Sequence, residues 1–169
     1  EHVEIVPIGF SLDDNPELVE AIRKKAEACG IPISNYAIGA NFIQPDEASY
    51  EAEIKRVMKH VDVANALGVK RMRHDVASRP IPEATAVNFL NDLPKLAEAC
   101  RRIADYAAQY GIVTSVENHG YYIQASDRVQ ALVHAVGRDN FRTTLDVGNF
   151  LCVDEPSVPA VKKNISIAS

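Results

Sequence analysis

The sequence predicts an α/β protein in which parallel strands alternate with helices. Short runs rich in Val and Ile alternate with longer segments whose apolar residues recur every three or four positions. The expected strands begin near residues 3, 33, 69, 112 and 141, so each strand–helix unit takes about 30 to 40 residues. Strands repeated in the same sense at this spacing are parallel and joined by right-handed crossovers. Both an open doubly wound sheet and a (β/α) barrel satisfy this pattern.

The first unit begins with an expected strand over residues 3–8, which are rich in Val and Ile. A helix follows, because Asn15 is a favoured N-cap residue and Pro16 suits the first helical position. Gly30 ends this helix in the left-handed conformation. The second strand is expected within residues 31–41.

The middle of the chain predicts two long helices. Residues 46–67 carry apolar side chains at helical spacing and are followed by Gly68, which ends the helix. A short strand is expected at 69–73. Residues 84–110 are again helical, and Pro94 within them is expected to kink the helix or to begin a second piece.

The last units have a strand at 112–116, a helix capped by Ser126 or Asp127, and a final strand at 141–145. The loop after the first strand, Pro7-Ile8-Gly9-Phe10-Ser11, does not match the GxGxxG phosphate-binding pattern. The dinucleotide-binding form of the open sheet therefore loses its main support.

Composition limits the classes of protein that remain. A chain of 169 residues with 47% hydrophobic and 24% charged residues is ordinary for a globular protein, and we expect one domain over residues 1–169. The 18 Lys and Arg against 23 Asp and Glu give a formal charge of −5, which argues against a nucleic-acid partner. No apolar run reaches the ~18 residues of a membrane span. Three cysteines without a CxxC pair indicate reduced thiols and a cytoplasmic location.

Polar side chains follow three of the five expected strands, at residues 73–75, 117–120 and 146–149. The carboxyl ends of parallel strands are where such folds carry their functional residues. If their strands are neighbours, ~4.8 Å apart, Glu117 and Asp146 converge and repel each other. A divalent cation removes this repulsion, and oxygen ligands suit Mg²⁺ or Mn²⁺, whereas an added histidine opens the site to Zn²⁺ or Co²⁺.

Each of these residues also has a purely structural interpretation. A carboxylate at a strand end often caps the next helix or pairs with a nearby base. Arg73 either clamps a substrate oxyanion or pairs with Asp75. We take His74 and His119 as candidate substrate-binding residues, although histidine is also a common hydrogen-bonding residue in loops.

Two short motifs carry a family resemblance, Val116-Glu117-Asn118-His119-Gly120 and Leu145-Asp146-Val147-Gly148-Asn149. With the unit of about 30 residues between them, they resemble the sugar phosphate isomerase/epimerase family of xylose-isomerase-like TIM barrels. The resemblance implies a partial (β/α) TIM barrel, with about five parallel units of the eight in a complete one.

The resemblance also implies a site. The family holds a divalent metal (Mn²⁺, Mg²⁺, Co²⁺ or Zn²⁺) with a glutamate, an aspartate, a histidine and a second glutamate. Glu117 takes the first role and Asp146 the second, and the other two ligands have no counterpart here. Many relatives, including the zinc-dependent abasic-site nucleases, have a histidine where this chain has Asn149. Substrate contacts are expected from Arg73, His74, His119 and Asn149.

The implied function is a metal-dependent isomerase or epimerase of a ketose or related polyol, phosphorylated or not. The reaction passes through an enediolate, with Glu117 as acid/base catalyst. Eight units would need about 270 residues, so we expect about five-eighths of a barrel, begun after the first unit and ended before the last two. The alternatives are a non-catalytic fragment or binding module, whose open edges favour a homo-oligomer, and a barrel hydrolase or lyase on a related polyol.

Overall fold

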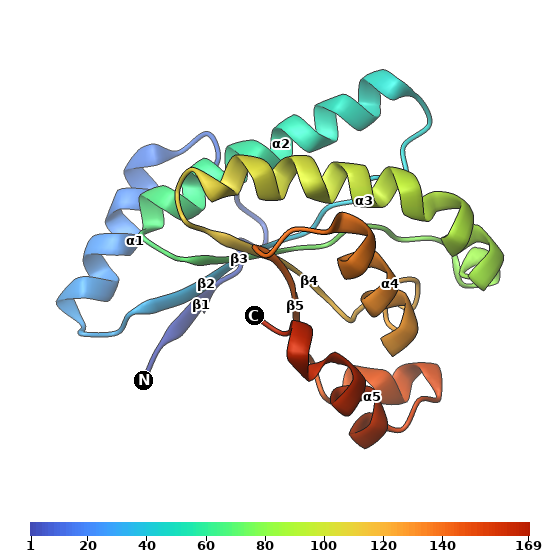
Figure 1. Cartoon of the computed structure of the whole chain (residues 1–169). Coiled ribbons are helices and arrows are strands. Elements are labelled where there is room, and N and C mark those ends of the chain that lie inside the picture. The colour runs from blue at the N-terminus through green and yellow to red at the C-terminus, as the bar shows by residue number, and fades with distance from the viewer.

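The structure is a computed structural model that describes all 169 residues, and its five strands form one parallel sheet (Figure 1). Every strand pairs with the strand that follows it in the chain. A doubly wound sheet would instead reverse its strand order at a switch point. The sequential order is therefore that of a (β/α) barrel, and the expected partial barrel is confirmed. The strands are β1 Val3–Ile5, β2 Ile33–Ile38, β3 Arg71–His74, β4 Val113–Glu117 and β5 Phe141–Thr144.

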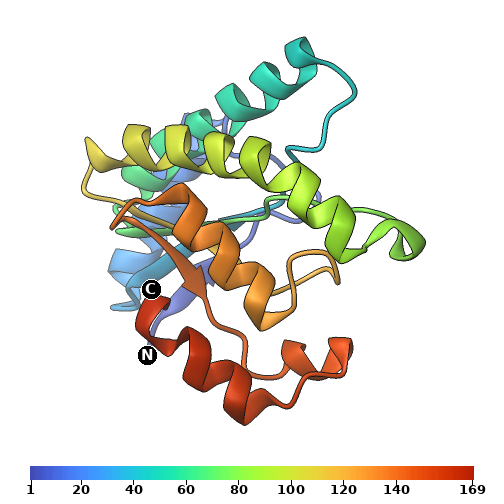
Figure 2. The same cartoon turned by 45° about the vertical axis from the view of Figure 1, so that its right-hand side comes forward.

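The sheet is also curled, as a barrel wall must be. A hollow of about 410 Å³ on the face without helices is lined by Glu4 of β1 and by Thr144 of β5, which are the two edge strands. His2 and Ser169 line the same hollow, so the two ends of the chain lie near each other (Figures 1 and 2). Ala168 forms a parallel bridge with Thr143 on the outer edge of β5.

The helices pack on the convex side of the sheet, each against the next one in the chain (Figures 1 and 2). They supply most of the apolar core, together with the side chains of the strands that face them. None of the helices is long and apolar enough to cross a membrane. The helices are α1 Pro16–Ala28, α2 Glu47–Leu67, α3 Ala86–Ala108, α4 Ser126–Val136 and α5 Ser157–Asn164, with single 3₁₀ turns at Ile81–Glu83, Asn149–Val153 and Ile165–Ile167.

Two helix starts follow the capping chemistry of the sequence. The Asn15 side chain accepts from the backbone N–H of Leu18, and Pro16 occupies the first position of α1. Asp46 caps α2 in the same way. Gly68 ends α2 at a φ of 79°, where a residue with a side chain would be strained.

Two details of the expected helices differ in the structure. Helix α3 is continuous through Pro94, so this proline does not begin a second helix. The carbonyl that Pro94 leaves without a helical donor belongs to Leu90, which lies on the exposed side and is open to water. Neither Ser126 nor Asp127 caps α4; instead the Glu155 carboxylate accepts from the backbone N–H of Ser126 at 2.8 Å.

The strands present two chemically different faces because alternate side chains point to opposite sides. Met72 and His74 of β3 are buried beneath the helices, whereas Arg71 and Arg73 belong to the other face. By register, the residues that share this second face run across the sheet. We call it the concave face; it carries Glu4, Asn35, Arg71, Arg73, Ser115, Glu117, Arg142 and Thr144.

Candidate functional site

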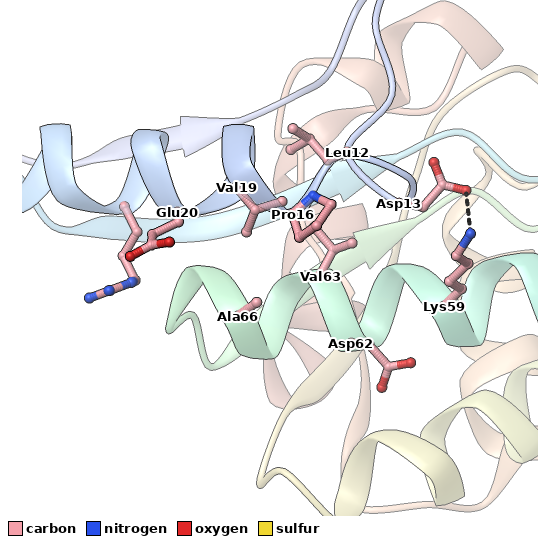
Figure 3. A pocket seen from close by; sticks show the side chains of 10 residues that line it. Leu12, Asp13, Pro16, Val19, Glu20, Lys59, Asp62, Val63 and Ala66 are labelled. Atoms are coloured by element: carbon pink, nitrogen blue, oxygen red, sulfur yellow. Dashed lines mark ion pairs between the residues drawn. The ribbon is translucent and has the colours of Figure 1, made fainter.

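A cavity of about 280 Å³ lies at the carboxyl ends of β2, β3 and β4. Glu117 and His119 line it from β4 and its following loop, and Asp75 lines it from the end of β3. The larger hollow between α1 and α2, about 480 Å³, contains none of the expected site residues (Figure 3). Its Lys59 is already paired with Asp13 and Asp14. The smaller cavity is therefore the candidate site.

Glu117 ends β4 and is held from two sides. Its Oε2 lies 3.1 Å from Nη2 of Arg73, and its Oε1 accepts from Nδ2 of Asn149 at 3.3 Å. The other arm of Arg73 reaches Asp75, with Nη1 2.7 Å from Oδ1. The side chains of Arg73 and Glu117 are 18% and 17% exposed, so this ion pair is shielded from most solvent. Of the two roles that the sequence left open for Arg73, the pairing with Asp75 is present, and Arg73 also forms an ion pair with Glu117.

Asp146 follows β5 and shapes the turn after it. Its Oδ1 accepts from the backbone N–H groups of Gly148 at 2.7 Å and Asn149 at 3.0 Å. This carboxylate therefore closes the turn that leads into the short helix at Asn149–Val153, which is a structural role. Both hydrogen bonds end on Oδ1, so Oδ2 is left for other ligands. Asn149 contacts both Asp146 and Glu117, and it joins the two carboxylates.

The two candidate histidines lie in different places. His119 is exposed and lines the cavity beside Glu117. His74 is wholly buried on the opposite face of β3, between the rings of Phe42 and Phe141. The expectation that His74 joins the site is therefore corrected, because adjacent residues of a strand cannot share a face.

His74 has instead the environment of a core residue. Its Nδ1 donates to the carbonyl oxygen of Asp75 at 2.9 Å, whereas its Nε2 has no partner. Burial lowers the pKa of the ring, which outweighs the contribution of that hydrogen bond. The imidazole is therefore neutral at pH 7.

Two buried amides support the site, and sequence reasoning missed them. Asn118 donates from Nδ2 to the carbonyl oxygen of Asp146, and its Oδ1 accepts from the N–H of the same residue, both at 2.8 Å. Gln124 accepts from the N–H of Tyr121 at 2.6 Å and donates to the carbonyl oxygen of Asn149 at 2.5 Å. Asn118 lies within the motif Val116-Glu117-Asn118-His119-Gly120, but nothing in the sequence distinguishes its side chain from an ordinary loop amide.

The charges of the site fit a divalent cation. Glu117, Asp75 and Asp146 carry three negative charges, and Arg73 supplies one positive charge. The remaining charge of about −2 and the oxygen donors of Glu117 and Asp146 suit a hard cation such as Mg²⁺ or Mn²⁺. No group of three or more His, Cys, Asp or Glu side chains in the structure surrounds a common point. Glu117 and Asp146 alone would therefore supply only part of a ligand set.

A curled sheet of sequential β/α units with carboxylates at the carboxyl ends of its strands defines part of a β/α barrel with a barrel-type site. The chain belongs to the xylose isomerase-like TIM barrel family, whose model matches residues 1–167. The resemblance inferred from the two motifs is confirmed. No curated protein matches the sequence significantly.

Solved structures agree on the fold. D-psicose 3-epimerase from Clostridium cellulolyticum H10, solved with D-tagatose, gives a TM-score of 0.80 at 16% identity over 99% of this chain and 60% of that chain. The 3-keto-D-glucoside 4-epimerase from E. coli gives 0.76 at 14% identity, covering 90% and 62%. A xylose isomerase-like TIM barrel protein from Mycobacterium smegmatis in complex with magnesium gives 0.73 at 19% identity, covering 98% and 60%. The chain thus spans about three-fifths of the length of these structures.

Proposed function

We propose that the protein is a metal-dependent isomerase or epimerase of a ketose or related polyol. The observation that carries this proposal is the joining of Glu117 and Asp146 through Asn149 at the carboxyl edge of the sheet. Membership of the xylose isomerase-like family and the two sugar epimerases of the same fold support it. The activity belongs to a protein with a complete ligand set, in which these residues supply half of the site.

Glu117 and Asp146 are the residues that would hold the metal. When bound, a divalent cation polarises the substrate carbonyl and acidifies the neighbouring C–H. The Glu117 carboxylate takes the proton from that carbon. In epimerisation a second acid, on the opposite face of the substrate, returns a proton to the same carbon; in isomerisation the proton is delivered to the adjacent atom. The Arg73 guanidinium, which already contacts Glu117, stabilises the negative charge that develops on the substrate oxygen.

His119 and Asn149 complete the substrate contacts in this proposal. His119 is exposed in the cavity wall and is able to hydrogen-bond a sugar hydroxyl. The Asn149 side chain orients Glu117 and offers its amide to the same substrate. His74 has no substrate role, because it lies beneath the helices. We also propose a cytoplasmic location, which the odd number of cysteines and the lack of a CxxC pair support.

The test is solvent deuterium incorporation into a panel of ketoses and their phosphates, with Mn²⁺ present, followed by ¹H NMR. Glu117→Gln keeps the shape of the side chain but removes the base, and we expect exchange to fall by about 10²-fold or more. Glu98→Gln is the matched control, because Glu98 lies on the surface in an ion pair with Arg101. Unchanged exchange in Glu117→Gln contradicts the proposed role. Loss of water from the substrate, or its hydrolysis, would favour the lyase or hydrolase alternative.

A second candidate is a binding module that associates through its open face. Arg71 and Glu4 are exposed on the concave face, and the outer edge of β1 has no partner strand. Unpaired strand edges favour association between copies. Light scattering separates the two candidates: a monomer that incorporates deuterium supports the enzyme, whereas an inactive oligomer supports the module.

A further inference from the structure

We infer that Asn118 is a positioning residue that fixes the separation of the Glu117 and Asp146 carboxylates. This inference rests on the proposed function, because it concerns the site that those two residues form. Asn118 is not itself a ligand or an acid/base group. Its side chain acts through the backbone of Asp146.

The backbone pairing of β4 and β5 ends just before Asn118. The last pair in register is Glu117 with Thr144, and beyond it the backbones no longer form a ladder. Asn118 is the next residue, and its carboxamide continues the pairing in place of the backbone. Both polar backbone groups of Asp146 are satisfied by this one side chain, each at 2.8 Å. We call these two hydrogen bonds the clamp; they extend the order of the sheet to Asp146, which bears the second carboxylate.

Burial makes the clamp specific to asparagine. Asn118 is 0% exposed, so water does not replace a lost hydrogen bond without entering the core. Only a carboxamide offers a donor and an acceptor side by side on so short a side chain. An ionised aspartate has the same shape but two acceptors, one of which would face the carbonyl oxygen of Asp146. The amide orientation is determined by the partners, since the Asp146 N–H requires an acceptor.

The contacts around the site close into a ring. Glu117 is covalently joined to Asn118, Asn118 holds Asp146, and Asp146 accepts from the backbone of Asn149. The side chain of Asn149 then returns to Glu117. Each carboxylate is therefore fixed through two routes, and Asn118 is the member of the ring that is furthest from solvent. Residues that orient ligands in this way typically change metal affinity by about 10- to 100-fold.

The experiment compares Asn118→Asp with Asn140→Asp in the purified protein. Asn140 is the matched control because it lies just before the opposite end of β5. Its amide donates to the carbonyl oxygens of Ala104 and Ile112, away from the site. Two quantities are measured: Mn²⁺ affinity, by electron paramagnetic resonance of free Mn²⁺, and the hydrogen-exchange rate of the Asp146 amide, by NMR. Asn118→Ser is a milder variant that keeps an acceptor for the Asp146 N–H and guards against loss of folding.

We expect Asn118→Asp to weaken Mn²⁺ binding by about tenfold or more and to speed exchange of the Asp146 amide. The control should stay within about twofold, and Asn118→Ser should fall between the two. The added carboxylate attracts a cation, so weaker binding in Asn118→Asp reports lost position rather than changed charge.

The inference about Asn118 and the proposed function can fail separately. Wild-type Mn²⁺ affinity and wild-type exchange in Asn118→Asp overturn the positioning role while the proposed function stands. If the unmodified protein binds no Mn²⁺, the proposed metal role of Glu117 and Asp146 loses its support, and the exchange rate alone then decides the inference about Asn118. Faster exchange of the Asp146 amide upholds the clamp, and an unchanged rate overturns it.

Discussion

Glu155 lies outside the candidate site, and its replacement by alanine should destabilise the fold by about 2 to 3 kcal/mol. The carboxylate accepts from both the backbone N–H and the hydroxyl of Ser126, and it lies 3.4 Å from Nζ of Lys163. Loss of a helix cap costs about 1 kcal/mol. Loss of the charged acceptor for the wholly buried Ser126 hydroxyl adds about 1 to 2 kcal/mol. The half-exposed Lys163 adds little.

Urea denaturation at pH 7 measures this loss. With a slope near 2 kcal/mol/M, the midpoint should fall by about 1 M. Asp127→Ala is the matched control: Asp127 was one of the two expected caps, but it is exposed and accepts only from the N–H of the adjacent Arg128. We expect that change to cost about 0.5 kcal/mol. A larger loss for Asp127→Ala than for Glu155→Ala would refute the assignment of Glu155 as the cap.

The difference between wild type and Glu155→Ala should also depend on pH. Burial alone raises the pKa of Glu155, but the hydrogen bonds from Ser126 and the charge of Lys163 outweigh it, so the pKa lies below its ordinary value. The unfolded chain then takes up the proton before the folded chain does. The stabilisation by Glu155 is complete above the ordinary carboxyl pKa of about 4.3 and is lost as the pH falls through the folded value. The two unfolding curves should therefore converge in acid.

Two further predictions concern buried and charged groups. Burial lowers the pKa of both His60 and His74, so the free energy of unfolding should fall below pH ~6.5 by up to about 1.4 kcal/mol per pH unit for each ring. Urea midpoints at pH 7.5 and 5.5 measure this loss. A His74→Leu variant whose stability depends on pH as the wild type's does would contradict the prediction. Arg73→Met leaves Glu117 and Asp75 without the guanidinium that pairs with both. Mn²⁺ should therefore bind about three- to tenfold more tightly while deuterium incorporation falls. Calorimetry that finds weaker binding would show that Arg73 organises the carboxylates rather than competes for them.

The parallel units could be predicted because they rest on local patterns. Apolar side chains at helical spacing and the residues around Asn15 and Gly68 act within a few positions of the chain. Helix α5 was not predicted: it has only eight residues, with Pro159 inside its first turn, and gives too short a pattern. The capping of α4 by Glu155 could not be predicted either, because Glu155 lies 29 positions from Ser126 in the sequence.

The site could be predicted only in part. Position after a strand was enough to find Glu117 and Asp146, because the carboxyl ends of parallel strands share one edge. Position was not enough for His74. The alternation of a strand assigns Arg73 and His74 to opposite faces, and the apolar Met72 two residues before His74 marks its side as the buried one. The role of Asn118 could not be predicted from the sequence, because it depends on contact with the end of another strand.

The structure changes the physical argument for a metal. From the sequence, the repulsion between Glu117 and Asp146 was itself the reason to expect a cation. In the fold, Arg73 already lies 3.1 Å from Glu117, so the pair is tolerated without one. What favours a divalent ion is instead the charge of about −2 that remains after Arg73 is counted, together with the Oδ2 of Asp146 that no protein group occupies. A cation bound there would share Glu117 with Arg73, and the guanidinium would then be free to contact a substrate oxygen.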